Sequence, residues 1–593
     1  MKRVFLITIL VLLPLSLVFS SNSNQKYYAV SSNQWGIVND VCHLAGVVGP
    51  SSNGPITAYQ LSLALDRAEK VLGENNQIIK VAREMIGEME TIYEDDLGFI
   101  SLSLEANGEV YLQSNGKNLI PSAFDIDDDW FIRNYRERPA IISLTLENGI
   151  NEYLYSRFVF QAKQKQFTDN YWIEGVHFGF YGARISQNFP YDAGISVGTK
   201  GFSLITGRGR VSLGEGYTGN TAIGDNYDYQ EFLKMGFYTR NTGVNLTLTS
   251  FDSSRNTIKD GTSVIENPYS VQNSKFSGYR ELRHNAQYEM VIVDRIKLSL
   301  AFITLLDTDT AFDFRYLNPF MMLHSMYNFH EGSILEANNM ISVDVSWAIA
   351  KKLNLYFQLT MDQFQITGEA DAYTNAFLYT DPNALAGLLN LSYTDACGEG
   401  IGRLFLEAVY TMPGMYLNQK YYDEGENVTQ YKGEMNNTKS EYISSFDPCW
   451  SQDFLLGYSR TESMGKNDMA FSGYIYGPDA LVVALGGEYY VPNKMNVTSR
   501  ILYMAHGEKG RGDAEGNYNF HGIDSADTIN TLSPTGLVEH TIAISAECDW
   551  SLSEFVSLYG GAAYSYRWNY KNEEGRNLGN LQTAFGIKLS YTL

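Results

Sequence analysis

The strongest constraint on this chain is a regular alternation of apolar and polar residues, which runs from Phe99 to the last residue, Leu593. Segments such as 295–306 and 402–412 place an apolar residue at every second position, which is typical of β-strands with one buried face. Strands of about 9–11 residues match the tilted crossing length of a bilayer. Since so many strands would leave costly open edges, the pattern favours a closed barrel.

The connections between these strands also follow the pattern of a transmembrane barrel, with short turns at one end and long loops at the other. Thr242-Gly243, Lys351-Lys352 and Pro492-Asn493 are predicted to be short turns. The Asn-Gly pairs at 107–108 and 148–149 predict two further hairpin turns. Long polar stretches lie near 161–171, 250–280, 365–400, 417–450 and 504–535. The sequence thus predicts a mainly β chain that forms a large antiparallel barrel of roughly 16–20 strands.

Composition and charge exclude several other classes of protein. The chain has 593 residues, a formal net charge of −23, 42 Tyr and 31 Phe. No nucleic-acid partner is expected, because phosphate binding needs a basic face. A mean hydropathy of −0.22 argues against a helical transporter, which needs many apolar runs of about 20 residues.

The first 97 residues differ in style from the rest. Residues 1–20 combine a basic start with an apolar run and small residues before a cut after Ser20, which predicts a secretory signal peptide. Residues 21–97 are predicted to form a small helical domain, because from Pro55 onward the apolar residues recur at helical spacing. Gly73 is expected to divide this segment into two helices, since glycine is unfavourable inside a helix. Residues 98–593 would then form the barrel.

The end of the chain reads as the closing strand of such a barrel. Phe585, Ile587, Leu589, Tyr591 and Leu593 form one apolar face. A terminal alternating strand in bacterial outer-membrane proteins both closes the barrel and is recognised by the assembly machinery, so that machinery is an expected partner.

The four cysteines lie far apart and show no CxxC pattern. In an oxidising compartment Cys397 and Cys449 could pair, since both lie in loop-like sequence. Alternatively, all four thiols are free.

Four segments together resemble the capsule assembly Wzi family of outer-membrane proteins. They are 206–238 with its Gly-Arg strand and Gly-rich turn, 314–329 with Arg-x-x-Asn-Pro-aromatic, the hairpin 338–365, and the late hairpin 476–510. The resemblance implies a bacterial outer-membrane barrel of about 18 strands. It also implies a periplasmic helical domain and an extracellular face that holds surface polysaccharide.

Two segments carry the candidate binding residues. Arg208 and Arg210 lie among glycines, and arginine can pair with the carboxylate of an acidic sugar. The alternative is that both arginines form salt bridges in the barrel lumen. The Gly-rich stretch 211–220 after them is expected to fold inward.

The second candidate segment, 314–329, is rich in aromatic residues, and its proline argues against a central strand position. It is expected to fold into the lumen as a loop or short helix. Arg315, Tyr316 and Asn318 are the candidates for carbohydrate contact here, because aromatic rings stack on sugars while Arg and Asn bind hydroxyl groups. The alternative role is packing of an interior plug.

No catalytic motif, cofactor site or metal site is predicted from the sequence. The leading hypothesis is a non-enzymatic outer-membrane barrel that binds or organises surface, capsular-type polysaccharide. A porin for small solutes and a surface adhesin or antigen are the alternatives. The expected partners are outer-membrane lipid, surface polysaccharide and the assembly machinery.

Overall fold

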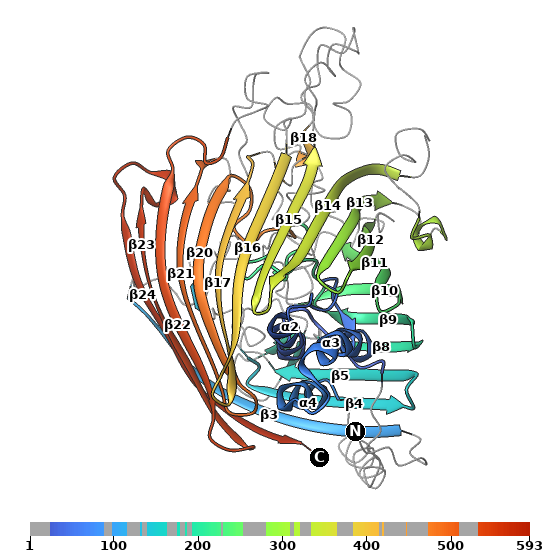
Figure 1. Cartoon of the computed structure of the whole chain (residues 1–593). Coiled ribbons are helices and arrows are strands. Elements are labelled where there is room, and N and C mark those ends of the chain that lie inside the picture. Colours follow the sequence, from blue (N-terminus) through green and yellow to red (C-terminus); the bar gives the residue numbers. More distant parts are fainter. Residues whose placement is uncertain are drawn as a thin grey trace.

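The computed structural model describes 24–87, 98–114, 131–132, 139–162, 175–177, 184–186, 192–226, 229–252, 280–308, 314–320, 334–363, 384–413, 415, 418–419, 446–447, 472–508 and 532–592. Within these residues eighteen strands form one closed antiparallel barrel (Figure 1). The predicted fold class, a large antiparallel barrel with a small N-terminal helical part, is therefore confirmed.

Each barrel strand pairs with its neighbours in chain order, apart from two short pairs that lie outside the barrel sheet, β6–β7 (Gly175–His177, Arg184–Ser186) and β18–β19 (Asn418–Gln419, Phe446–Asp447). The barrel strands are β3 (Gly98–Gln113), β4 (Ile142–Ile150), β5 (Leu154–Ala162), β8 (Asp192–Thr199), β9 (Phe202–Gly209), β10 (Gln230–Tyr238), β11 (Thr242–Asp252), β12 (Arg280–Ile292), β13 (Ile296–Thr308), β14 (Ile334–Ala350), β15 (Leu353–Gln363), β16 (Ala384–Cys397), β17 (Gly400–Thr411), β20 (Ala480–Val491), β21 (Met495–His506), β22 (Glu539–Ser551), β23 (Val556–Trp568) and β24 (Leu578–Thr592).

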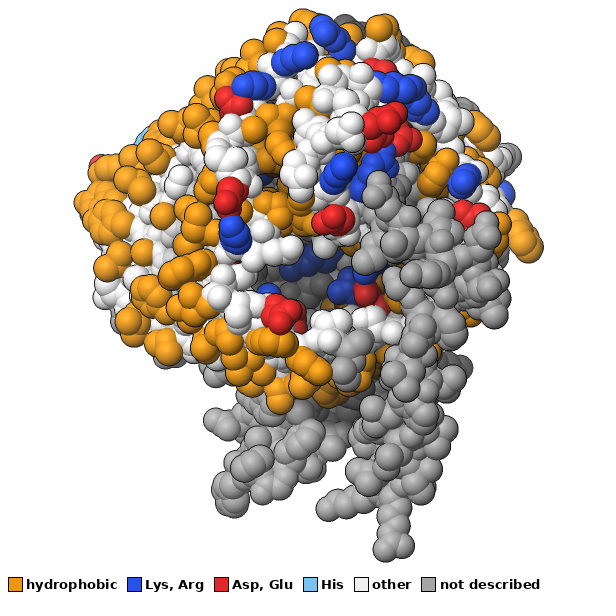
Figure 2. Space-filling view, turned by 60° about the horizontal axis from the view of Figure 1, so that its bottom comes forward, with side chains coloured by type: hydrophobic (Ala, Val, Ile, Leu, Met, Phe, Trp, Pro, Cys, Tyr) orange, Lys and Arg blue, Asp and Glu red, His pale blue; other side chains and the backbone are white. Residues whose placement is uncertain are grey.

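Side chains alternate between a polar lumen and an apolar outer surface. Leu404 and Leu485 point outward and are 62% and 52% exposed, whereas Gln358 and Glu407 point inward and are buried. Hydrophobic side chains accordingly gather over the outer wall (Figure 2). This is the arrangement of a barrel that crosses a bilayer with its strands. Among the described helices, none is both long and apolar enough to span a membrane.

The last strand closes the barrel, as the alternation at the end of the chain predicts. β24 pairs with β3 from Gln582 to Thr592. The predicted turn at Asn107-Gly108 is wrong, because these residues lie within β3 and pair with Lys588 and Ile587 of β24. A hairpin at this point would have left β24 without a full-length partner.

The second Asn-Gly prediction is wrong in position. β4 continues through Gly149, and the turn to β5 occupies residues 151–153. Gly149 instead leaves room for the ring of Phe99 on β3, whose Cε1 lies 2.2 Å from the place that a Cβ atom would take. The turns predicted at Lys351-Lys352 and Pro492-Asn493 are confirmed. The turn predicted at Thr242-Gly243 lies slightly earlier, at residues 239–241.

The N-terminal unit contains α2 (Asn33–Ala45), α3 (Ala58–Leu72), α4 (Gln77–Met85) and the short strands β1 (Tyr27–Tyr28) and β2 (Ile56–Thr57). α3 begins with a capping box between Thr57 and Gln60 and ends before Gly73, so the predicted division at this glycine is confirmed. The sequence prediction missed α2. The three helices bury a common core that includes Val38, Val41, Leu61, Leu65 and Ile79.

The helical unit lies at the end of the barrel that carries the short turns (Figure 1). The backbone N–H of Lys352, in the β14–β15 turn, donates to the carbonyl of His43 at 2.8 Å. The N–H of Val48 donates to Asp294 in the β12–β13 turn at 2.9 Å. Backbone bonds therefore fix the helices to the wall at this end.

Candidate functional site

The first contact between the helices and the inner wall is a buried group of charges. Arg403 of β17 donates to Asp40 of α2 at 2.7 Å and also bonds Glu488 of β20. Its guanidinium lies 4.6 Å from the ring centroid of Tyr217. Burial raises the pKa of Asp40 to about 6, although the neighbouring Arg403 opposes this shift. Asp40 of α2 and Glu488 of the wall therefore share the Arg403 cation, which holds α2 against the wall.

Two buried lysines hold the segment that joins α2 to α3. Lys234 of β10 donates to the carbonyl of Pro55 at 2.7 Å and to that of Asn53. Lys297 of β13 donates to the carbonyl of Pro50 and forms an ion pair with Glu215 at 2.7 Å. These lysine side chains satisfy carbonyl groups that would otherwise be buried without partners.

The predicted inward fold of the Gly-rich loop is confirmed. Glu407 of β17 accepts the backbone N–H groups of Tyr217 and Thr218 at 2.8 and 2.7 Å. Gln358 of β15 accepts the N–H of Thr221 at 2.8 Å. Two wall side chains thus hold the loop across the lumen.

The glycines of this loop serve close packing. A Cβ atom on Gly216 would lie 2.0 Å from the carbonyl oxygen of Gly219, and one on Gly214 would lie 2.2 Å from the side chain of Asn220. Gly214 also has a φ of +133°, which other residues rarely adopt. The loop is therefore a compact internal element.

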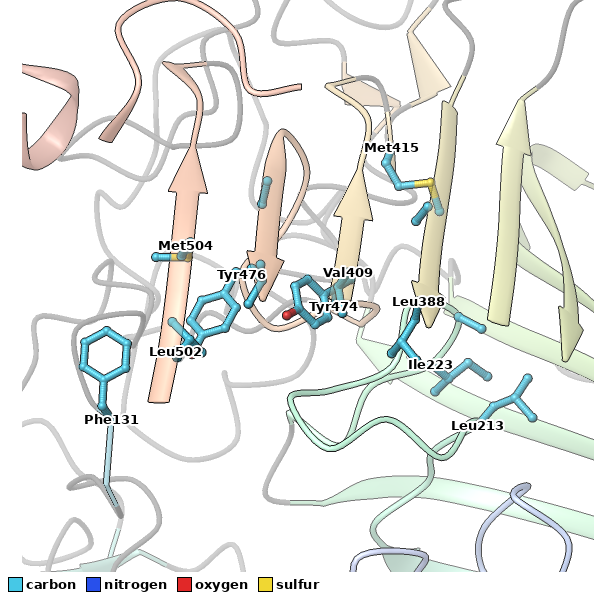
Figure 3. Packing of buried hydrophobic residues seen from close by; sticks show 14 of the residues in the cluster. Phe131, Leu213, Ile223, Leu388, Val409, Met415, Tyr474, Tyr476, Leu502 and Met504 are labelled. Carbon is cyan, nitrogen blue, oxygen red and sulfur yellow. The ribbon is translucent and has the colours of Figure 1, made fainter. Parts of the chain in front are cut away.

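Above the loop an apolar cluster crosses the lumen (Figure 3). It joins Leu213 and Ile223 of the loop to Tyr474 and Tyr476 of the segment before β20, and it includes Phe131 from the connection between β3 and β4. Its wall members come from both sides of the barrel and include Tyr111, Ile303, Leu388, Val409, Leu502, Met504 and Ala563. This apolar layer disfavours water and ions in this part of the lumen.

Two polar cavities remain between the N-terminal unit and the wall. One, of about 470 Å³, lies between α2 and the wall of β17 to β22 and is lined by Arg403, Glu488, Arg500 and Glu547. The other, of about 750 Å³, lies beside β3 to β9 and is lined by Glu147, Arg157 and Asp192. Residues 31–33 line both cavities. A hollow is visible near the centre of the face shown in Figure 2.

The structure separates the two predicted arginines. Arg208 pairs through Nε with Glu231 at 2.7 Å. Ile205 and Lys234 lie opposite one another in β9 and β10 and face the lumen. Arg208 and Glu231 also lie opposite one another, at positions of the other parity, so both of their side chains are on the outer face. The predicted lumen position is therefore wrong for Arg208. Arg210 does line the larger cavity and pairs with Asp225 at 3.4 Å.

The inward fold predicted for 314–329 is wrong over its described part, 314–320. Tyr316 is buried against Leu246, Leu248 and Ala286. These residues face outward, because Asn245 and Gln287, beside them in β11 and β12, hydrogen-bond inside the lumen. Arg315 and Asn318 are exposed on the same outer side. The sequence could not reveal this, since an aromatic segment is compatible with either face; residues 321–329 lie outside the described residues.

The five candidate binding residues are therefore not gathered at one place. The sequence did not single out the side chains that hold the plug, which consists of the N-terminal helical unit and the Gly-rich loop. These residues are Asp40, Arg403, Glu407, Lys234 and Lys297. Their signal is a charged residue at an inward position of an otherwise regular strand, which identifies lumen contacts only once the register is known.

Other expected features are only partly described. Cys397 is free and exposed, Cys42 is free and buried, and Cys548 is free and half-buried, whereas Cys449 lies outside the described residues. No group of three or more His, Cys, Asp or Glu side chains in the described ranges is placed to hold a metal ion.

His43 provides a test of how α2 is held. Burial, together with Arg403 and Lys297, lowers the pKa of His43 to about 3, and both ring nitrogens lack a partner among the described residues. Because the pKa of His43 is lower in the folded chain than in the unfolded chain, its contribution to the free energy of unfolding is present above about pH 6.5. This contribution is lost as pH falls towards the pKa in the folded chain. Asp40 acts in the opposite direction, since its pKa is raised, so a matched variant is required.

We expect His43→Gln to remove this dependence. The stability difference between wild type and His43→Gln should change by about 2 kcal/mol between pH 7.5 and pH 5.0. Amide hydrogen exchange in α2, corrected for intrinsic rates, measures it. An unchanged difference across this interval would show that His43 is not buried in its neutral form.

Comparisons with known proteins gave matches only among solved structures. No family model matches the chain, and no curated protein does. The Wzi outer-membrane protein of Escherichia coli, described as a carbohydrate-binding β-barrel involved in group 1 capsule assembly, is 12% identical, with 94% of this chain and 98% of that chain covered and a TM-score of 0.48. OprD of Pseudomonas aeruginosa is 8% identical, with 83% and 94% covered and a TM-score of 0.37. A loop-deleted OmpT of Vibrio cholerae is 7% identical, with 84% and 100% covered and a TM-score of 0.30.

Proposed function

We propose that this chain is a plugged, non-enzymatic barrel of the bacterial outer membrane that binds or organises surface polysaccharide at its long-loop end. The observation that carries the proposal is the apolar cluster across the lumen, together with the helices fixed below it. A barrel filled in this way is better suited to presenting a surface than to conducting solutes.

The remaining assignments belong to the same proposal. Residues 1–20 would be removed after export, 21–97 would form a periplasmic domain, and 98–593 would form the barrel. Membership of the Wzi family is part of it and rests on the four similar segments. The partners would be outer-membrane lipid, surface polysaccharide and, through β24, the assembly machinery.

Conductance distinguishes this function from that of a porin. A porin would require the two polar cavities to continue past the apolar layer. We expect no large, stable single-channel steps from the wild-type protein in planar bilayers. Replacing 211–224 with a short Gly-Ser linker should raise conductance, because it removes the loop part of the layer. Heat-modifiable mobility on gels would show that the variant barrel is intact. Large steps from the wild type would favour the porin.

Glycan binding tests the other half of the proposal. At a net charge of −23 the chain repels an anionic polymer over about 10 Å at moderate salt, so local cations are needed. Arg208, Arg210 and Arg315 are proposed for this role, with Tyr316 and Asn318 as neighbouring contacts. Since Tyr316 is buried, its contribution would be to position the segment.

The double variant Arg208→Ala/Arg210→Ala should weaken binding to an acidic surface glycan about tenfold or more, and most strongly at low salt. The matched control is Lys200→Ala/Lys494→Ala, which removes the same charge from turns at the opposite end. Equal losses in both variants would indicate a general charge effect. Unchanged binding would leave the arginines as structural ion pairs.

A further inference from the structure

The feature that the plugged-barrel function leaves unexplained is the position of residues 314–320 on the outside of the barrel wall. The 3-10 helix η5 (Phe314–Leu317) and the residues after it lie beside β12 and β13 (Figure 1). The Tyr288 hydroxyl donates to the carbonyl of Pro319, and Phe320 stacks on the Tyr288 ring with centroids 6.0 Å apart. The segment is thus fixed on the surface that faces lipid in the proposed function.

The wall beneath this segment is more polar than the belt around it. His284 and Thr304 lie opposite one another on the outer face of β12 and β13, and they are only 1% and 4% exposed. The His284 ring lies against the backbone of Tyr316. The Thr304 hydroxyl donates to Asn339 at 2.7 Å, so the segment mainly keeps the His284 ring away from the hydrocarbon, where a polar group is costly.

The other side of the segment exposes two aromatic rings beside the polar side chains of Arg315 and Asn318. Phe314 is 82% exposed and Phe320 is 72% exposed. Leu298 and Leu300 of β13 lie nearer the short turns and are exposed as part of the apolar belt. The segment covers the strand from Phe302 onward, so Phe314 and Phe320 continue this belt. Two aromatic side chains at the edge of a lipid-facing belt are typical of the membrane interface.

The backbone of the segment is also suited to this position. Irregular backbone is excluded from hydrocarbon unless its polar groups find partners. Here the N–H of Asn318 donates to the carbonyl of Arg315 at 3.1 Å, and the N–H of Phe320 donates to the Asn318 side chain at 3.1 Å. Together with the bond from Tyr288, these contacts satisfy some of the backbone groups of the segment.

We propose that residues 314–320 form an aromatic membrane anchor, in which Phe314 and Phe320 insert among the lipid chains of the leaflet nearest the long loops. The inference rests on the proposed membrane-spanning barrel. It assigns to the segment a lipid partner and a shielding role for His284.

Spin labels placed at exposed positions test the anchor without disturbing the core. The parent is the full chain with Cys397→Ser, Cys449→Ser and Cys548→Ser, because Cys42 is buried. Phe320→Cys is labelled and reconstituted in vesicles of phosphatidylethanolamine and phosphatidylglycerol. Collision with oxygen, which concentrates in lipid, is compared with collision with a water-soluble nickel chelate. Leu404→Cys in the belt and Val293→Cys in a turn, 85% exposed, are the references for lipid and water.

We expect the label at 320 to resemble that at 404, with severalfold higher oxygen than nickel accessibility, while the label at 293 shows the reverse. If the label at 320 is accessible to nickel while the label at 404 is accessible to oxygen, the anchor is overturned and the membrane-spanning barrel is retained. Nickel accessibility at 404 would overturn the membrane span and the anchor with it. Spin–spin broadening at 320 that disappears on dilution with unlabelled protein would identify a second copy as the partner and overturn the lipid assignment.

Discussion

Deletion of residues 581–593 is expected to abolish assembly of the barrel. β24 pairs with β23 on one side and with β3 on the other, so its loss opens two ladders at once. Each unpaired backbone group facing lipid costs several kcal/mol, and the deletion leaves many such groups along both strands. The measurements are fractionation with the outer membrane and heat-modifiable mobility on gels.

Deletion of 592–593 alone is the control, because only the last residue pair of the β24–β3 ladder, Thr592 with Ser103, is lost. We expect this variant to assemble as the full chain does. A folded, membrane-associated product from the 581–593 deletion would mean that β23 and β3 can close the barrel directly.

The sequence revealed those parts of the fold that depend on local pattern. Period-two alternation predicted the barrel, and helical spacing with Gly73 predicted α3 and α4, because each signal lies within a few residues of the chain. The signal at Asn107-Gly108 failed because partners at the other end of the chain decide the outcome: pairing of β3 with β24 holds these residues in a strand.

The plug was only partly predictable for the same reason. The glycines of 211–220 indicated a compact inward loop, which the structure confirms. The carboxylate that holds this loop, Glu407, lies almost 200 residues later in the chain, and on its own it is an isolated acidic residue in a strand. The 314–320 segment shows the limit most clearly, since its residues suit either face of the wall and only the contact of Tyr316 with Leu246 and Leu248 decides between them.

Replacement of Arg403 by Met is expected to release α2 from the wall. The substitution leaves buried Asp40 and half-buried Glu488 without their shared cation, and breaking the buried Asp40–Arg403 pair costs about 3–5 kcal/mol. Cys42 of α2, which is fully buried, reports the release. In the chain with the other three cysteines replaced by Ser, its alkylation by a neutral maleimide should accelerate by about 10²–10³-fold at pH 7.

Two further variants determine whether charge is the cause. Arg576→Met removes a surface partner of Glu573, whose side chain is 59% exposed, and should leave the rate unchanged, since such pairs contribute about 0–1 kcal/mol. Asp40→Asn/Arg403→Met/Glu488→Gln removes all three charges and should restore most of the protection. Acid should also partly restore protection in Arg403→Met, because a neutral Asp40 no longer needs the cation. A triple variant as reactive as Arg403→Met would show that the arginine acts through packing on Tyr217 instead of through its charge.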